Sequence, residues 1–280
     1  MAKIKVIDDS PPAEVRAAMQ RGGLLHRLTQ VGFIVKGAVY LFVGVLALML
    51  AALGDGETTD AQGAVRRMAE QPFGAFALVA ATVGLLAFAL WQFICAIFNT
   101  EREKADWGGR IKRITYFFSG IAHSGLGLYA FSALQGTARR SDQTRAWTTR
   151  LMHAPLGSWL VMLIGLILIV ACIAIIRGAF LKNFLKTLRT NEMSRTELAW
   201  ATRVGTWGNT ARGVVFGIIG IFMMFAGWWE NPRKARGFEG ALDTLLAQPA
   251  GNLLLGGVAF GLALFGIFSL VEARYRKIRT

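Results

Sequence analysis

The sequence predicts an all-α, polytopic membrane protein with six transmembrane helices, built as three parallel two-helix repeats in a pseudo-three-fold arrangement. The first indication is composition: 54% of the 280 residues are hydrophobic, 17% are charged and the mean hydropathy is +0.45. That chain is too apolar for an ordinary soluble domain. The second indication is six long apolar runs, and the third is a set of marks that recurs three times along the chain.

Each apolar run approaches the roughly 20 residues that a helix needs to cross the hydrocarbon layer of a membrane. The runs carry apolar residues all round, without the polar stripe of a helix on a soluble core. Many of the 32 glycines lie inside them, where they allow helices to approach closely. The expected spans are 33–53, 73–98, 114–135, 156–176, 208–229 and 250–271.

The repeat is marked by two glycines seven residues apart, in "KGAVYLFVG" (36–44), "SGIAHSGLG" (119–127) and "RGVVFGIIG" (212–220). An arginine stands ten residues before the first glycine of each pair, and a proline follows that glycine by 35 or 36 residues. Such regular spacing indicates tandem units, and an even number of spans in each unit gives all of them the same orientation. The expected divisions are an N-terminal tail (1–26) and repeats at 27–104, 110–189 and 203–280.

One residue lies three positions after the first glycine of each pair and shares its helix face. We expect this face to form the seam between neighbouring helices, because glycines permit close packing of spans. The predicted seam residues are Gly37, Tyr40 and Gly44 in the first repeat, Gly120, His123 and Gly127 in the second, and Gly213, Phe216 and Gly220 in the third.

These marks, together with "Q/A-P-x-G" before the even spans and "EARYRK" at 272–277, resemble the uncharacterised bacterial membrane family catalogued as domain of unknown function 1206. The resemblance covers nearly the whole chain after residue 25. It implies six spans in three two-helix repeats and supplies no established activity or catalytic residues. The middle copy departs from the pattern, with Ser119 for the cation and His123 for the aromatic residue, which counts against a strictly three-fold function.

Charge predicts the orientation. The segments on the side of the two termini carry 22 lysines and arginines against 9 acidic residues, whereas the three opposite loops carry 9 against 8. By the positive-inside rule, both termini are expected in the cytoplasm of a bacterium, with the protein in its cytoplasmic (inner) membrane. The basic residues form no recognisable nucleic-acid-binding motif, so the expected partners are anionic lipid headgroups on the cytoplasmic side and other membrane-protein subunits.

Five cations are candidates for contact with a lipid headgroup or another anion. Arg27, Arg110 and Arg203 stand at the inner edge of the odd spans, where they would anchor the helices. Lys36 and Arg212 precede the first seam glycine and are shallow enough for their side chains to snorkel to the headgroups. Their role is either general anchoring or a shared anion site beneath the pseudo-axis.

His123 is the one histidine inside a span, and a buried imidazole can bind a metal or haem or relay protons. A metal or haem site normally needs a second ligand, but His26 and His153 are expected at other depths. The cysteines Cys95 and Cys172 show no metal-binding spacing. The sequence therefore predicts no catalytic residue, no metal and no cofactor.

The polar residues expected within the bundle are Gln92, Ser119, Ser124 and Ser269, which would form hydrogen bonds between helices. No acidic residue is expected inside the membrane, because Glu272 would close the sixth span at the interface. Such an absence argues against a proton- or sodium-coupled carrier.

Two signals follow the fourth span. The segment 178–190, "GAFLKNFLKTLRT", places apolar and basic residues on opposite faces and predicts an amphipathic helix in the inner interface. The segment 194–197, "SRTE", predicts a capping box for a helix that runs into the fifth span.

The leading functional hypothesis is a non-enzymatic accessory or scaffold protein that packs against lipids or other membrane subunits. The alternative is a small channel or transporter that passes an anionic solute through the space between the repeats. A cofactor or enzyme site around His123 ranks third.

Overall fold

The computed structural model describes residues 24–53, 60–99, 107–138 and 143–277. The predicted tail, 1–26, lies almost entirely outside these ranges. Within them the named elements are helical: α2 (Leu24–Leu53), α3 (Ala61–Ala69), α4 (Gly74–Phe98), α5 (Trp107–Leu134), α6 (Gln143–Met152), α7 (Gly157–Phe180), the 3-10 turns η1 (Asn183–Thr187) and η2 (Thr190–Glu192), α8 (Arg195–Trp228), the 3-10 turn η3 (Pro232–Lys234), α9 (Phe238–Leu246) and α10 (Gly251–Tyr275).

Six of these helices, α2, α4, α5, α7, α8 and α10, are long and apolar enough to cross a membrane, which confirms the predicted spans. Several begin earlier than predicted, because the polar turns flanking an apolar run continue the helix. α8 shows how its start is fixed: Ser194 Oγ accepts a hydrogen bond from the backbone N of Glu197 at 3.2 Å, and the Glu197 carboxylate accepts one from the Ser194 backbone at 2.8 Å. The predicted capping box is thus present.

Each repeat consists of a long helix, a short helix and a second long helix: α2–α3–α4, α5–α6–α7 and α8–α9–α10. The "P-x-G" motif forms the bend between the short helix and the second long one. Its middle residue, Phe73, Leu156 or Ala250, has a positive φ of 68°, 59° or 60°. The glycine that follows begins the long helix, where a Cβ would collide with a carbonyl oxygen of the short helix. The motif therefore permits a sharp and close connection in all three repeats.

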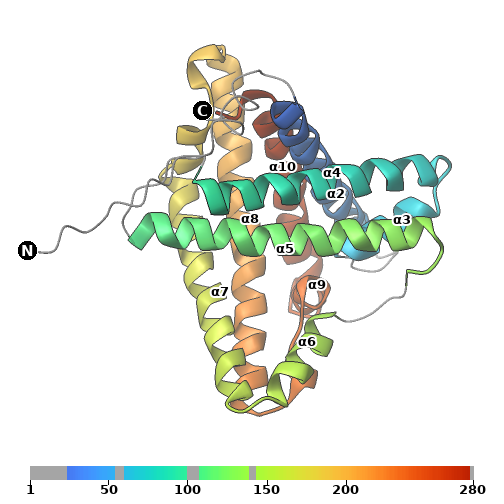
Figure 1. Ribbon diagram of the computed structural model, residues 1–280. Helices are drawn as coiled ribbons and strands as arrows, with labels where there is room; N and C mark the ends of the chain where they lie inside the picture. The colour runs from blue at the N-terminus through green and yellow to red at the C-terminus, as the bar shows by residue number, and fades with distance from the viewer. Residues whose placement is uncertain (1–23, 54–59, 100–106, 139–142, 278–280) are drawn as a thin grey trace, which may run out of the picture.

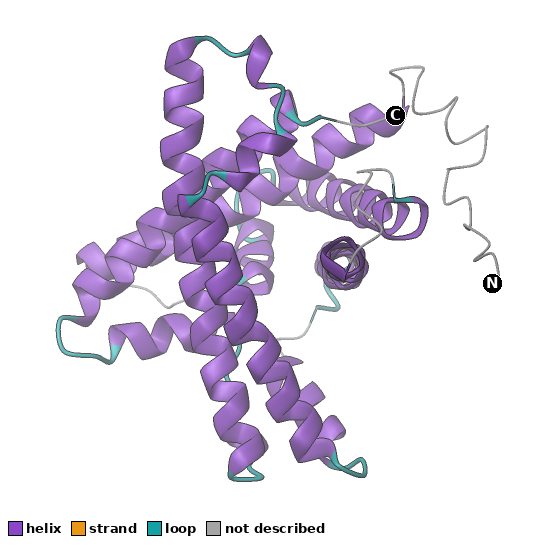
Figure 2. Ribbon diagram, turned by 90° about the vertical axis from the view of Figure 1, so that its left-hand side faces the viewer, coloured by secondary structure: helices purple, strands orange, loops and turns teal. Residues whose placement is uncertain are grey.

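The strongest packing joins consecutive repeats. α4 packs along α5, α7 along α8, and α10 returns to pack along α2. In Figure 1, α4 and α5 lie side by side and cross the pair formed by α7 and α8, and Figure 2 shows that the helix pairs point in different directions. Within repeats, α2 packs against α4 and α8 against α10, whereas α5 and α7 are not among the extensively packed pairs of the described residues. The pseudo-three-fold arrangement stays a prediction.

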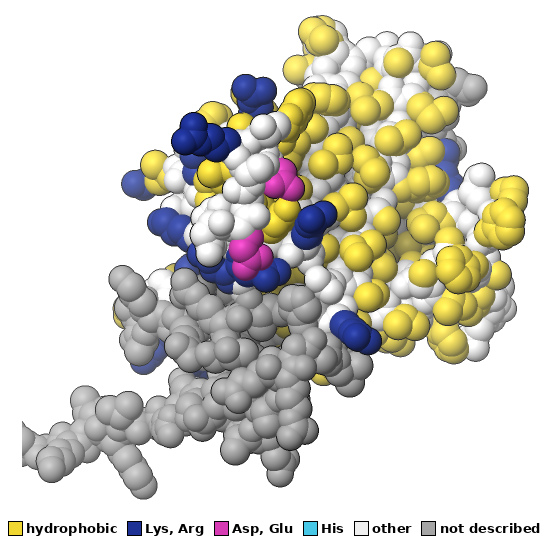
Figure 3. Space-filling model, turned by 90° about the horizontal axis from the view of Figure 1, so that it is seen from above, with side chains coloured by type: hydrophobic (Ala, Val, Ile, Leu, Met, Phe, Trp, Pro, Cys, Tyr) yellow, Lys and Arg dark blue, Asp and Glu magenta, His cyan; other side chains and the backbone are white. Residues whose placement is uncertain are grey.

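In every repeat the first long helix begins, and the second long helix ends, at the end away from the short helix. We call this end the inner end of the repeat and the other the outer end; in Figure 1 the inner ends of α4 and α5 lie at the left, and those of α7 and α8 and of α2 and α10 lie toward the top. The short helices α3, α6 and α9 lie at the outer ends. Seen from above in Figure 3, lysine and arginine side chains gather on one part of the surface, and apolar side chains cover much of the rest.

The six predicted seam glycines lie at the joints between repeats. A Cβ on Gly37 or Gly44 would meet the backbone of α10, at 2.8 Å from the Gly266 oxygen and 2.6 Å from the Ala263 nitrogen. The equivalent glycines of α5 face side chains of α4, and those of α8 face α7. Gly220 and Gly165 touch backbone to backbone, with hypothetical Cβ distances of 2.8 and 2.7 Å. The recurring glycine pair thus allows α2, α5 and α8, the first long helices of the repeats, to pack closely against α10, α4 and α7 of the neighbouring repeats.

Tryptophans occur near both ends of the long helices. Trp91 is buried with 3% of its surface exposed, and the other seven are exposed: Trp107, Trp200 and Trp207 toward the inner end, and Trp147, Trp159, Trp228 and Trp229 toward the outer end. Exposed tryptophans at these two levels are typical of the two interfaces of a membrane.

Candidate functional site: a buried cation cluster

Lys36 lies inside the bundle. Only 9% of its surface is exposed, and its Nζ lies 3.7 Å from Glu272 Oε2 on α10. The same Nζ faces the rings of Phe33, Phe88 and Phe265 at 5.1, 5.4 and 4.9 Å from their centroids. The prediction that this side chain snorkels to the headgroups is therefore wrong, because a carboxylate and three aromatic faces hold the ammonium group within the protein.

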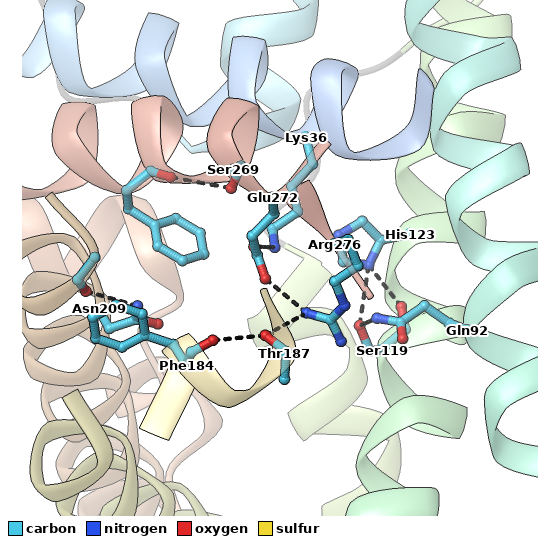
Figure 4. A network of polar contacts seen from close by, with 12 residues as sticks. Lys36, Gln92, Ser119, His123, Phe184, Thr187, Asn209, Ser269, Glu272 and Arg276 are labelled. Atoms are coloured by element: carbon cyan, nitrogen blue, oxygen red, sulfur yellow. Dashed lines mark hydrogen bonds and ion pairs between the residues drawn. The ribbon is translucent and has the colours of Figure 1, made fainter. Parts of the chain in front are cut away.

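Glu272, which the sequence predicts at the end of the sixth span, is buried among protein side chains with 7% exposure. α10 continues past it to Tyr275. Arg276 Nη1 donates to Glu272 Oε1 at 2.7 Å and lies 3.4 Å from Thr187 Oγ1 (Figure 4). One carboxylate thus pairs with two cations. The i, i+4 spacing of Glu272 and Arg276 in "EARYRK" is a sequence signal that could have indicated their pairing.

Arg212 lies beside the same aromatic group. Its guanidinium carbon is 4.9 Å from the centroid of Phe265 and 5.4 Å from that of Phe216. Lys36 Nζ is also 4.9 Å from the Phe265 centroid, so the two charges are separated by at most twice that distance. The Nε atom of Arg212 is buried, and no described residue accepts a hydrogen bond from it. The structure therefore brings together the two cations that precede the seam glycines.

We call Lys36, Arg212, Arg276 and Glu272 the cation cluster. It contains three cations and one carboxylate. Arg276 adds contacts with two rings, 5.3 Å from the centroids of Phe33 and Trp91. The cluster is therefore an aromatic-walled site toward the inner end of α10, and within the part of the chain that the structure describes its cations outnumber its carboxylates.

Helices α4 and α5 contribute neutral polar groups next to this site. Gln92 Nε2 donates to Ser119 Oγ at 2.6 Å, and His123 Nδ1 lies 2.7 Å from the Ser119 carbonyl oxygen (Figure 4). A carbonyl oxygen only accepts, so this contact places the proton on Nδ1 and leaves Nε2 as an acceptor. The His123 ring contacts Phe88 edge to face, with centroids 4.7 Å apart. Gln92 Oε1 is buried without a hydrogen-bond partner among the described residues.

The ring between the seam glycines turns toward the cluster in every repeat. Tyr40 contacts Phe265 at a centroid distance of 4.8 Å, His123 contacts Phe88, and Phe216 faces Arg212. The three equivalent positions therefore share a neighbourhood although their side chains differ.

The segment after α7 closes the inner end. The amphipathic helix predicted over 178–190 is wrong: α7 ends at Phe180, and Lys182 breaks the helix with a φ of 55°. Leu188 is fully buried, and its neighbour Arg189 donates from its backbone N to the Tyr275 oxygen at 2.7 Å. Phe184, Leu185 and Leu188 pack on α8 and α10, whereas Phe180 and Leu181 are exposed, so the chain forms a cap that brings Thr187 to Arg276.

The other three candidate cations lie outside the cluster. Arg27, Arg110 and Arg203 are exposed, and the guanidinium carbons of the last two lie 5.5 and 5.8 Å from the ring centroids of Trp107 and Trp200. These arginine and tryptophan pairs suit an interface between lipid and water.

No group of three or more histidine, cysteine or acidic side chains that could hold a metal is found within the described ranges. Cys95 is buried in the apolar group around Phe33, Phe88 and Trp91, and Cys172 is half-buried beside Gly217.

Comparison with known proteins places these features in a family. Residues 31–99, 114–182 and 207–276 each match the family described as Domain of Unknown Function (DUF1206). A relative from Bacillus subtilis (strain 168), described as "Uncharacterized protein YxxB", is 32% identical over 256 residues, which cover 91% of this chain and 92% of the relative. No solved structure matches. The chain therefore belongs to the DUF1206 family and is a multi-pass membrane protein with six apolar spanning helices in three tandem repeats.

Proposed function

We propose that this protein is a non-enzymatic accessory or scaffold protein of the bacterial cytoplasmic membrane, which binds an anionic lipid headgroup at its cation cluster. The observation that carries the proposal is the charge of that cluster around Arg212: among the described residues, three buried or half-buried cations lie together with a single carboxylate, and the buried Nε of Arg212 has no acceptor.

Excess charge in a protein interior is costly unless an opposite charge and hydrogen bonds compensate it. Glu272 compensates part of the charge of Lys36 and Arg276. Arg212 has aromatic contacts but no carboxylate partner among the described residues, and its Nε is a buried donor without an acceptor. A phosphate group would supply both the charge and the acceptor oxygens, and arginine binds phosphate well.

A lipid is the anion that best suits the location. Glu272 and Arg276 lie at the inner end of α10, and exposed arginines and tryptophans accompany the starts of α5 and α8. Basic residues at the cytoplasmic surface of a membrane attract anionic lipids by about 1 kcal/mol each. Other membrane-protein subunits are further partners under this proposal, through the apolar faces of the spanning helices.

The proposed orientation places the inner end and both termini in the cytoplasm, as the charge distribution favours. Reporter fusions at Thr280 should show a cytoplasmic location, and fusions within residues 136–155 should show the opposite side. The reverse pattern would move the cation cluster to the outer leaflet and remove the support from inner-leaflet lipids.

The central experiment is the double change Lys36→Gln with Arg212→Gln. Purification from native membranes followed by mass spectrometry should show less bound anionic lipid on a variant that still folds. Arg276 still pairs with Glu272 in this variant, which favours correct folding. The matched control is Arg150→Gln with Arg233→Gln, which removes two cations near the outer end. Unchanged lipid retention in the cluster variant would refute the proposal.

A second candidate function is a channel or transporter for an anionic solute. It is favoured by the position of the cluster between helices of different repeats rather than on an outer face. Uptake of sulfate or phosphate into vesicles that contain the purified protein would support it, especially if the same double change abolished uptake. Among the described residues, no contact of His123 specifically supports a cofactor or enzyme site, and we do not propose one.

A further inference from the structure

The second repeat lacks an aromatic pair that the other two bury. Sixteen and nineteen residues after the proline of the "P-x-G" motif, α4 has Phe88 and Trp91, and α10 has Phe265 and Phe268. All four are at most 3% exposed. The equivalent residues of α7 are Ala171, which is half-buried, and Ala174, which is exposed.

An open hollow of about 470 Å³ lies on α7 beside Ala174. Its apolar wall includes Val170, Ile173, Ala174 and Leu181. We call it the α7 groove. α5, which belongs to the same repeat, does not pack extensively against α7.

The inner end of the α7 groove is polar and positively charged. Arg177 and Asn183 line it, and Lys186 Nζ donates to Asn183 Oδ1 at 2.7 Å. Lys182 lies in the turn between them. Arg177, Lys182 and Lys186 are exposed, and none of them pairs with a carboxylate within the described residues.

We propose that the α7 groove binds one anionic phospholipid, with its phosphate at Arg177 and Asn183 and an acyl chain along Val170, Ile173 and Ala174. The groove matches such a molecule in both parts, with an apolar wall continuous with a cationic end. Arginine holds a phosphate with two parallel hydrogen bonds. Beside Ala174, the acyl chain takes volume that Trp91, at the equivalent position, fills in the first repeat. This site is separate from the cation cluster and does not depend on the function proposed above.

The test restores the missing side chains with the double change Ala171→Phe and Ala174→Trp, which copies the first repeat. The full-length protein is placed in vesicles of equal parts phosphatidylglycerol and phosphatidylcholine, with spin-labelled phosphatidylglycerol as the probe. We expect a motionally restricted signal from the unaltered protein and a several-fold smaller one from the variant. The matched control, Ala80→Phe, adds a ring at an exposed position of α4 and should leave the restricted signal unchanged.

The headgroup part of the site has its own variant. Arg177→Gln should remove the preference for spin-labelled phosphatidylglycerol over spin-labelled phosphatidylcholine, whereas Arg150→Gln near the outer end should preserve it. If Ala171→Phe with Ala174→Trp does not fold, the single change Ala174→Phe, at an exposed position, carries the same prediction with a smaller loss.

Three results would overturn the inference: an unchanged restricted signal in the groove variants, an equal loss in Ala80→Phe, or a dimer joined through α7 that assigns the groove to a second copy of the chain. The change Lys36→Gln with Arg212→Gln should leave the restricted signal intact. A result that refutes lipid binding in the α7 groove is therefore distinguishable from one that refutes anion binding at the cation cluster.

Discussion

In the first and third repeats the two long helices pack against each other, and we call these repeats closed. In the second repeat α5 and α7 do not pack extensively, and we call it open. In α2 a Cβ on Gly32 would come 2.6 Å from Phe88 Cβ of α4, and in α8 a Cβ on Gly208 would come 2.6 Å from the backbone of Phe265 in α10. Both repeats thus fit a phenylalanine against a glycine. The second repeat has Thr115 in place of that glycine, and α5 and α7 stay apart.

A second pair of positions repeats the contrast. Val35 of α2 packs against Gly84 of α4, and Ala211 of α8 packs against Gly261 of α10. The equivalent residues in the second repeat are Ile167 and Phe118, which are 57% and 63% exposed. Two apolar helices in lipid gain little from merely covering apolar surface, so close backbone approach decides whether they pair. A repeat with large residues at both positions therefore exposes them to lipid.

The largest expected effect comes from replacing Phe265 with alanine, the residue at the equivalent position of the second repeat (Ala171). Phe265→Ala removes a buried ring that contacts Tyr40, Lys36 and Arg212. We expect a loss of about 3–5 kcal/mol in the free energy of unfolding, from lost contacts and the cavity left behind. Denaturant titration in detergent measures it. Phe260→Ala, at a position 57% exposed on the same helix, is the control. Equal losses in the two variants would show that Phe265 does not close this repeat.

Glu272→Gln is expected to have the second-largest effect. It removes a carboxylate that the third repeat has and the others lack, since the equivalent residues are Cys95 and Gly178. Removal of the carboxylate leaves the buried Lys36 without its ion pair, which should destabilise the protein by on the order of 3 kcal/mol. Unfolding in detergent against the exposed control Glu230→Gln measures the difference. A variant as stable as the unaltered protein would show that the ion pairs do not hold α10 to α2.

Glycines of the seam should show a smaller, graded effect. Gly44→Leu directs a side chain at the backbone of α10 and should cost about 1–3 kcal/mol through overpacking. Gly120→Leu meets the side chain of Phe93, which can move more easily, so its cost should be lower. Gly125→Leu meets nothing within 4 Å and is the control. Thermal unfolding that ranks the three variants differently would place the close contacts elsewhere.

The smallest expected effect concerns the connection between the open and closed parts. Ser194→Ala removes the side-chain cap of α8 and should cost about 1 kcal/mol, whereas Ser194→Gly should cost only a few tenths of that. Thermal unfolding of the two variants checks this order. A larger loss with glycine than with alanine would mean that backbone flexibility, rather than the cap, limits stability at the start of α8.

Local patterns were sufficient for much of this molecule. Run length predicted the six spans, recurring spacing predicted the tandem repeats, and "SRTE" predicted the start of α8. Each of these signals depends on residues within one helix or on regular distances along the chain. The same reasoning failed for segment 178–190, because an apolar face at this spacing suits a membrane surface and a protein surface equally well. Only the position of α8 and α10 decided that Leu188 is buried.

The sequence by itself thus determined how many helices cross the membrane, how they repeat and where close contacts are permitted. The tertiary structure alone decided which residues meet: that Lys36 turns inward to Glu272, that Arg212 shares Phe265 with it, and that α5 and α7 do not pack extensively. The physical reason is that a cation near a helix end finds stabilisation either at headgroups or at a carboxylate on another helix. The choice depends on which helix lies opposite, and no pattern within a single span contains that information.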